Sequence, residues 1–168
     1  MIKNTVATKA VISIDLEDFY PSENDCVYID MKSYLFRELI LREADFREQV
    51  KTTDWNTFKD KYIGIYCSVD VVIPMWAYMV LASELSNIAK VVISGKKTDF
   101  PLAFLHYNLE TLSTHEFEGK RLVIKGCGEK PIDEKAFTII SRKLAPIARS
   151  IMYGEPCSSV AVYKKNVD

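Results

Sequence analysis

The sequence predicts an α/β protein, a single three-layer domain of residues 1–168 whose mainly parallel, mixed sheet is built from a duplicated β-loop-α-β unit, with an extra N-terminal strand and helices. Two observations support this fold class. An apolar segment, a loop, a helical segment and a second apolar segment follow one another in 61–95, and the same order returns in 120–165. Because a helix cannot fit inside a tight hairpin, the strands of each unit are expected to run parallel.

The first unit begins with an apolar strand. Residues 62–66 are rich in β-branched and aromatic side chains and end at Cys67. Pro74 suits the first turn of a helix, because its missing N–H has no intrahelical partner there, and this helix is expected to run to about Ser86. Residues 91–93 form the next strand, so the unit is typical of a right-handed crossover.

The second unit repeats this order with a strand at 122–124 and a helix at about 133–144. The segments 85–95 and 144–154 share leucine, isoleucine, alanine, glycine and a basic residue in register. Shared residues in a shared order of elements favour an internal duplication. Under this interpretation Cys127 occupies the place of Cys67.

Two interpretations are open for the chain after residue 150. In one, 150–153 is a strand and 160–163 returns antiparallel to it, so that Cys157 lies at the sheet edge that carries the other strand-end cysteines. In the other, the preceding helix continues through Met152, and Cys157 lies at the opposite edge.

The N-terminal part, about 1–60, is expected to add a strand at 11–15 and two consecutive helices in 31–50. A second apolar piece, 27–29, is a candidate partner for the first strand. A connecting helix at about 99–113 joins the two repeat units.

Composition excludes several classes of partner. The 22 basic and 23 acidic residues are mixed along the chain and give a formal net charge of −1, so no footprint for nucleic acid or an anionic membrane is visible. No apolar run approaches the roughly 20 residues that cross a bilayer, and no secretory signal is apparent. We therefore expect a cytoplasmic protein that contacts neither nucleic acid nor membrane, while a protein partner or a homo-oligomer is compatible with the sequence.

Three of the four cysteines follow predicted strands. If Cys67, Cys127 and Cys157 share one sheet edge, their thiolates could hold zinc or an iron-sulfur cluster, with Asp70 or an outside ligand completing the set. No Cys-x-x-Cys pair supports this grouping. The alternative interpretation is structural, because cysteine is common in partly buried positions near strand ends.

Cys127 is the candidate for a reactive thiol. Gly126 and Gly128 leave its side chain open, and the helix N-terminus that follows would favour the thiolate. The alternative is a turn that merely needs glycine. No histidine lies nearby in sequence to act as a general base, so a hydrolase triad has little support.

Other polar groups are weaker candidates. Asp15, Glu17 and Asp18 follow a strand, as magnesium ligands often do, but an acidic surface turn is the favoured interpretation. His106 is expected to pack within its own helical segment rather than to bind a ligand. Trp76 and the apolar residues around it are expected to be core or to contact a partner.

Several segments resemble an uncharacterised bacterial family, the domain of unknown function 2480 family. They are 15–21, 62–70, 73–78, 123–128 and 152–158. The resemblance covers nearly the whole chain and implies no catalytic residue. It also extends to products encoded near iron-sulfur assembly genes, which implies thiol or metal chemistry.

Three functions therefore remain open. The leading hypothesis is an accessory protein that binds a transition metal or an iron-sulfur species through Cys67, Cys127 and Cys157, in cluster assembly or maturation. The second is a non-catalytic protein-interaction module with structural cysteines. The third is a thiol or persulfide redox enzyme that uses Cys127, so the sequence leaves open whether the protein is an enzyme.

Overall fold

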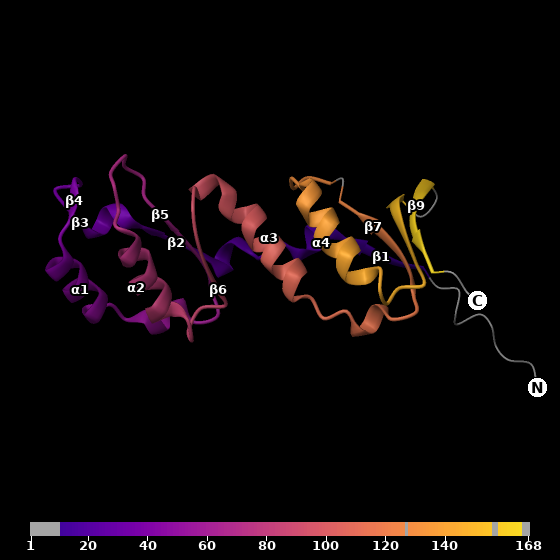
Figure 1. Ribbon diagram of the computed structural model, residues 1–168, viewed down its shortest axis with the longest axis horizontal. Coiled ribbons are helices and arrows are strands. Elements are labelled where there is room, and N and C mark those ends of the chain that lie inside the picture. Colours follow the sequence, from indigo (N-terminus) through magenta and orange to yellow (C-terminus); the bar gives the residue numbers. More distant parts are fainter. Residues whose placement is uncertain (1–10, 127, 156–157, 166–168) are drawn as a thin grey trace, which may run out of the picture. The chain divides into compact units, whose positions relative to one another are not determined.

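The computed structural model describes residues 11–126, 128–155 and 158–165 (Figure 1). The strands of these residues form a four-stranded sheet, a three-stranded sheet and a two-stranded hairpin. The chain divides into two compact units: unit 1 contains the described parts of 1–20 and 105–168, and unit 2 contains 21–104. The predicted α/β class with mainly parallel, mixed sheets is confirmed. None of the described helices is long and apolar enough to cross a membrane.

Unit 2 contains a parallel sheet in the order β2-β5-β6. Its helices and strands are η2 (Glu23–Asp25), β2 (Cys26–Asp30), η3 (Met31–Tyr34), β3 (Leu35–Phe36), β4 (Ile40–Leu41), α1 (Glu43–Thr52), η4 (Trp55–Phe58), β5 (Tyr62–Tyr66), α2 (Met75–Leu85), β6 (Val91–Ser94) and η5 (Lys97–Asp99). Here η denotes a 3₁₀ helix. Helix α3 (Phe100–Thr111) begins in unit 2 and ends in unit 1.

Unit 1 contains the four-stranded sheet in the order β1-β7-β8-β9. Besides the end of α3, its elements are β1 (Val11–Asp15), η1 (Leu16–Phe19), η6 (His115–Phe117), β7 (Arg121–Lys125), α4 (Glu134–Leu144), β8 (Ser150–Glu155) and β9 (Ser158–Lys164). The strands β1, β7 and β8 are parallel, whereas β9 is antiparallel to β8. The strand at 150–153 and its antiparallel partner at 160–163 are therefore confirmed, and the helix through Met152 is wrong, while Cys157 lies outside the described residues.

Local chemistry explains why the helices begin where the sequence predicts. Helix α2 starts directly after Pro74, and α4 starts after Asp133, whose Oδ1 accepts a hydrogen bond from the N–H of Ala136 at 3.0 Å. Helix α3 also confirms the connecting helix expected at about 99–113.

Two N-terminal predictions are wrong. Of the helices expected in 31–50, only the second is an α-helix. The first is reduced to the 3₁₀ helix η3, because Arg37 and Glu38 adopt positive φ angles of 52° and 59° and the chain turns there between β3 and β4. Strand β2 does not pair with β1, since its five residues pair with β5. In both cases pairing between distant segments overrides a local sequence pattern.

Backbone hydrogen bonds show that the two units share one construction. Asp60 N–H donates to Ile88 O at 2.9 Å, and Gly119 N–H donates to Ile147 O at 2.9 Å, with both residue numbers raised by 59 (119 − 60 and 147 − 88). Likewise, Lys90 N–H donates to Lys61 O at 2.9 Å, and the equivalent Arg149 N–H donates to Lys120 O at 2.8 Å. The predicted duplication is confirmed.

The duplication extends further than the sequence indicated. Asp15 ends β1 and accepts a hydrogen bond from Glu17 N–H at 3.1 Å, just as Asp30 ends β2 and accepts one from Lys32 N–H at 3.0 Å. Each aspartate starts a 3₁₀ helix in this way. Each unit therefore contains an outer strand ending in aspartate, a helix, a central strand, a second helix and a third strand.

The repeat corrects the comparison of the cysteines. Tyr62 pairs with Val91 as Arg121 pairs with Ser150, so the central strands align Tyr66 with Lys125. When the repeats are aligned in this register, Cys67 corresponds to Gly126 and Ser68 corresponds to Cys127. Cys127 therefore does not occupy the place of Cys67, as expected above, but lies one position later in its unit.

A close approach of Phe100 to Gly64 closes one face of the sheet in unit 2. A Cβ atom on Gly64 would lie 2.5 Å from the ring of Phe100, which is almost fully buried. The same ring stacks on Phe104 and on Tyr28, with centroids 6.0 Å and 5.8 Å away. Position 64 in the middle of β5 therefore requires glycine.

Replacing Gly64 by alanine is expected to destabilise unit 2 by about 1–3 kcal/mol, because the buried ring must move to admit the new methyl group. Both tryptophans, Trp55 and Trp76, lie in unit 2, so their fluorescence during urea unfolding measures this change. Gly95→Ala is the matched control: its Cβ would lie 3.9 Å from Phe100, an ordinary contact, and we expect a change within about 0.5 kcal/mol. Equal effects of the two variants would contradict the close-approach argument.

Candidate functional site

The carboxyl ends of β1, β7 and β8 meet at one edge of the sheet of unit 1, where open α/β sheets usually bind ligands. Asp15 and Lys125 are register partners there, and Lys125 Nζ lies 3.3 Å from Asp15 Oδ2. This contact raises the pKa of Lys125, and the negative charge of Glu155 at the end of β8 raises it further. The edge therefore has alternating negative and positive groups.

Glu17 connects η1 to the loop that follows β7. Its Oε2 accepts a hydrogen bond from Glu129 N–H at 3.2 Å. Its Oε1 is buried and has no hydrogen-bond partner among the residues that the structure describes. A Cβ atom on Gly128 would overlap this carboxylate, so the carboxylate would have to move if another residue replaced Gly128. Glu17 thus contributes a desolvated carboxylate oxygen to the site.

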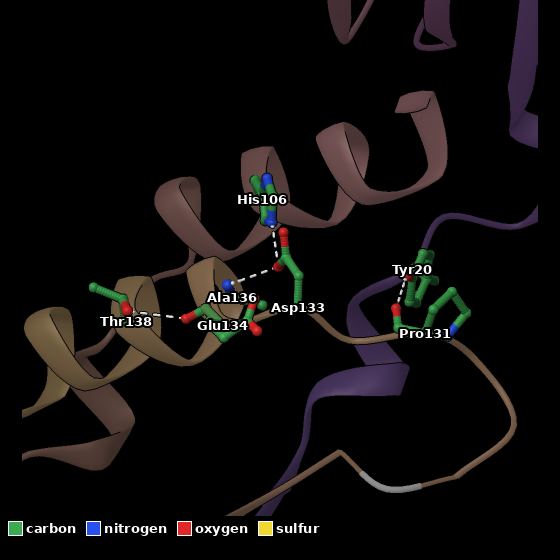
Figure 2. A network of polar contacts seen from close by, with 7 residues as sticks. All are labelled: Tyr20, His106, Pro131, Asp133, Glu134, Ala136 and Thr138. Atoms are coloured by element: carbon green, nitrogen blue, oxygen red, sulfur yellow. Dashed lines mark hydrogen bonds and ion pairs between the residues drawn. The ribbon is translucent and has the colours of Figure 1, made fainter. Parts of the chain in front are cut away.

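Tyr20 holds the same loop at a second point. Its hydroxyl donates a hydrogen bond to the carbonyl oxygen of Pro131 (Figure 2). Lys130 Nζ lies 5.2 Å from the centre of the Tyr20 ring. Burial raises the pKa of Tyr20, and the negative charges of Asp133 and Glu17 raise it further. The phenol therefore stays protonated and remains a hydrogen-bond donor.

His106 and Asp133 form the third attachment, between α3 and the start of α4 (Figure 2). His106 Nε2 lies 2.7 Å from Asp133 Oδ1, and because a carboxylate can only accept, this nitrogen carries the proton. Burial alone would raise the pKa of Asp133, but the hydrogen bonds from His106 and Ala136 outweigh it and lower that pKa. The aspartate is ionised at neutral pH and positions the imidazole.

These three attachments fix the loop between β7 and α4 while leaving a set of groups suited to chemistry. A histidine positioned by a carboxylate can transfer protons, and a buried carboxylate oxygen can bind a cation or accept a proton. The attachments belong to unit 1 alone. In the alignment of the two repeats, Arg47 occupies the position of His106 and Pro74 the position of Asp133. Unit 2 therefore cannot form a histidine–aspartate pair at these positions.

Unit 2 holds its equivalent loop by a simpler contact. Asp30 Oδ1 accepts hydrogen bonds from the N–H of Ser68 and of Lys32, each at 3.0 Å. Burial would raise the pKa of Asp30, but hydrogen bonds, that of Ser68 foremost, lower it overall. One carboxylate thus does in unit 2 what Glu17, Tyr20 and His106 do in unit 1.

The residues proposed from sequence as metal ligands are distributed over both units. Cys67 follows β5 and Asp70 lies in the next loop, both in unit 2. Cys127 and Cys157 lie outside the described residues, although the strands that precede them, β7 and β8, belong to the sheet of unit 1. A shared sheet edge therefore no longer supports grouping all three thiols.

No group of three or more His, Cys, Asp or Glu side chains within 11–126, 128–155 and 158–165 has the geometry of a metal site. This includes Asp15, Glu17 and Asp18: the side chain of Asp15 makes a local turn contact with Glu17 N–H, and that of Glu17 reaches Glu129 N–H in the loop after β7. The sequence suggested that His106 packs within its own segment, so its contact with Asp133 at this site was missed. His106 meets Asp133 across 27 residues, a separation that leaves no local pattern.

A double-mutant cycle tests the contact between Gly128 and Glu17. Gly128→Ala is expected to destabilise unit 1, because the methyl group displaces the carboxylate from Glu129 N–H. With Glu17→Ala in the same chain the methyl group has space, so the double variant should be more stable than the sum of the single effects by about 1 kcal/mol or more. Urea unfolding followed by far-UV circular dichroism measures all four chains. Additive effects would show that the carboxylate does not fill this space.

Asp133→Asn tests the charge of the His106 partner. The folded pKa of Asp133 is lowered, so its charge stabilises the fold above the unfolded pKa, and this contribution is lost as the pH falls through the folded value. We expect the variant to lose about 1 kcal/mol at neutral pH, because asparagine still caps α4 but is uncharged. Its stability should then fall less steeply than that of the unaltered protein below about pH 4. Parallel stability curves in acid would contradict the assignment.

Comparison with known proteins agrees with the resemblance of segments such as 62–70 and 123–128. A sequence model with the description "Protein of unknown function (DUF2480)" matches residues 1–165. A search of the curated proteins found no match, and neither did a search of the solved structures. Because the family match covers nearly the whole chain, the chain belongs to the DUF2480 family.

Proposed function

We propose that unit 1 binds a soft transition metal or an iron-sulfur species through Cys127 and Cys157, and that the protein is an accessory protein in handling that species. One observation carries the proposal. Strands β7 and β8 are parallel neighbours that end at Lys125 and Glu155. In the sequence, a cysteine is the second residue after each of these ends. Parallel neighbours end at the same sheet edge, and thiolates are the ligands that zinc and iron-sulfur species prefer.

The ligand set differs from the one expected from sequence. Cys67 and Asp70 belong to unit 2, so they are not part of this proposal. Glu17 replaces them as the candidate for an oxygen ligand, because its buried Oε1 lies against Gly128, next to Cys127 in the chain. When bound, the metal or cluster would supply Lewis-acid or electron-transfer chemistry. A cytoplasmic location, which keeps such thiols reduced, belongs to the same proposal.

Metal content of the full chain, purified without oxygen or chelator, tests this function. We expect the protein to retain or take up zinc or iron, and Cys127→Ala and Cys157→Ala each to weaken binding by about a hundredfold in competition with a chromophoric chelator. Glu17→Gln should weaken it by about tenfold. Thermal unfolding of each metal-free variant confirms that its fold is intact.

Cys67→Ala and Cys26→Ala are the matched controls, because both remove a cysteine of unit 2. They should leave metal affinity unchanged. If Cys67→Ala weakens binding as much as Cys127→Ala, or if no metal binds and all four thiols react alike, the proposal is wrong. A persulfide on Cys127 without metal would instead support a thiol or persulfide enzyme.

A second candidate function, protein interaction, has a separate observation in its favour. Val72, Met75 and Met79 lie before and on α2 and are 93%, 73% and 70% exposed, although large apolar side chains usually become buried or bind partners. Trp76 itself packs edge-on against Phe46, with ring centroids 5.5 Å apart. A partner bound at these side chains would remain bound in the cysteine variants.

A further inference from the structure

A cleft at the amino end of the strands of unit 1 has an unusual concentration of positive charge. It has a volume of about 390 Å³, and its lining includes Arg121 at the start of β7, Arg149 before β8, and Lys164 and Lys165 at the end of β9. These residues are brought together by the sheet itself, because Ser150 pairs with Lys164 in register and Lys165 N–H donates to the carbonyl oxygen of Arg149 at 3.0 Å.

Among the residues that the structure describes, no acidic side chain lines this cleft. Arg121 and Arg149 form no ion pair with any residue of the described ranges. Two other exposed arginines do have such partners: Arg47 lies 2.8 Å from Glu43, and Arg142 lies 2.8 Å from Glu110. Cations gathered without a counter-charge from the described residues repel one another, and a bound anion would relieve this repulsion.

The repeat shows that this charge is particular to unit 1. In the register of the duplication, Tyr62 stands for Arg121 and Lys90 stands for Arg149. Lys90 Nζ lies 4.6 Å from the ring centre of Tyr62, an attractive cation-π contact. Unit 1 thus has two like charges where unit 2 has a favourable pair. Strand β9, which has no counterpart in the sheet of unit 2, adds the two lysines.

We propose that this cleft binds a small organic phosphate. Guanidinium groups bind phosphate oxygens through paired hydrogen bonds, and lysines add point charges. The volume lies in the range of small-molecule sites, and Met152 and Tyr163 line the cleft beside the cations, where they can contact an apolar part of the ligand. The charge is confined to one cleft of a chain whose net charge is −1, which favours a small ligand over a nucleic acid.

The probes are inorganic phosphate and phenyl phosphate, titrated into the full chain by calorimetry at low salt. Phenyl phosphate is expected to bind at one site and more tightly than inorganic phosphate. Arg121→Gln and Arg149→Gln should each weaken its binding by at least about tenfold, since each removes a charged hydrogen-bonding group. Arg142→Gln, which removes the same charge from an exposed pair with Glu110, is the matched control and should bind as the unaltered protein does.

A double variant separates binding from folding. Arg121→Tyr together with Arg149→Lys installs the pair found in unit 2, so it should unfold at the same temperature as the unaltered protein or higher, and it should not bind phenyl phosphate. The proposal is overturned if no saturable binding occurs up to about 10 mM phenyl phosphate, or if Arg121→Gln and Arg142→Gln bind equally. It is also overturned if a single-stranded oligonucleotide binds more tightly than phenyl phosphate and loses affinity in Arg121→Gln.

Discussion

The register of the central strand in each unit determines where every other group lies. In each unit two backbone hydrogen bonds join the residues just before the central strand to the turn that leads into the third strand. In unit 2, for example, Lys90 N–H donates to the carbonyl oxygen of Lys61. Asp60 and Gly119, which begin these contacts, both adopt left-handed φ angles, 59° and 67°. Glycine accepts this conformation freely and aspartate tolerates it better than most residues. The outer strands pair on the other side of the central strands, and their register places Asp15 beside Lys125 and Asp30 beside Tyr66.

The two units keep the same scaffold but differ at both ends of the sheet. At the carboxyl edge, unit 2 holds its loop by Asp30 alone, whereas unit 1 uses separate contacts from Glu17, Tyr20 and His106. At the amino edge, unit 2 has an attractive contact between Lys90 and the ring of Tyr62, whereas unit 1 has a cluster of cations at the corresponding positions. The shared positions are buried and apolar, as with Ala77 and Ala136 or Leu85 and Leu144. Packing therefore preserves the scaffold, and the exposed ends of the strands are where the units differ in chemistry.

Much of the fold could be predicted from local sequence, since helix starts at Pro74 and Asp133 depend on neighbouring residues. The strands of the repeat could also be predicted, because their apolar runs and their order recur. The pairing of β2 with β5 could not be, because nothing within either segment specifies its partner. The contact of His106 with Asp133 was missed for the same reason, and a shift of one residue misaligned Cys67 with Cys127. Errors thus arose where distant segments meet.

Unit 2 is inserted within unit 1, and this has a consequence for how the chain folds. All strand pairs of β2, β5 and β6 fall between residues 26 and 94, so this sheet can be completed while the ribosome is still making the rest. Strand β1 leaves the ribosome before unit 2, yet its partner β7 comes much later, since Val11 pairs with Arg121. Closing so long a loop adds little to the entropy cost, which grows with the logarithm of length, but such non-local pairing is slow. Strand β1 is therefore synthesised before the sheet of unit 2 but joins its own sheet after it.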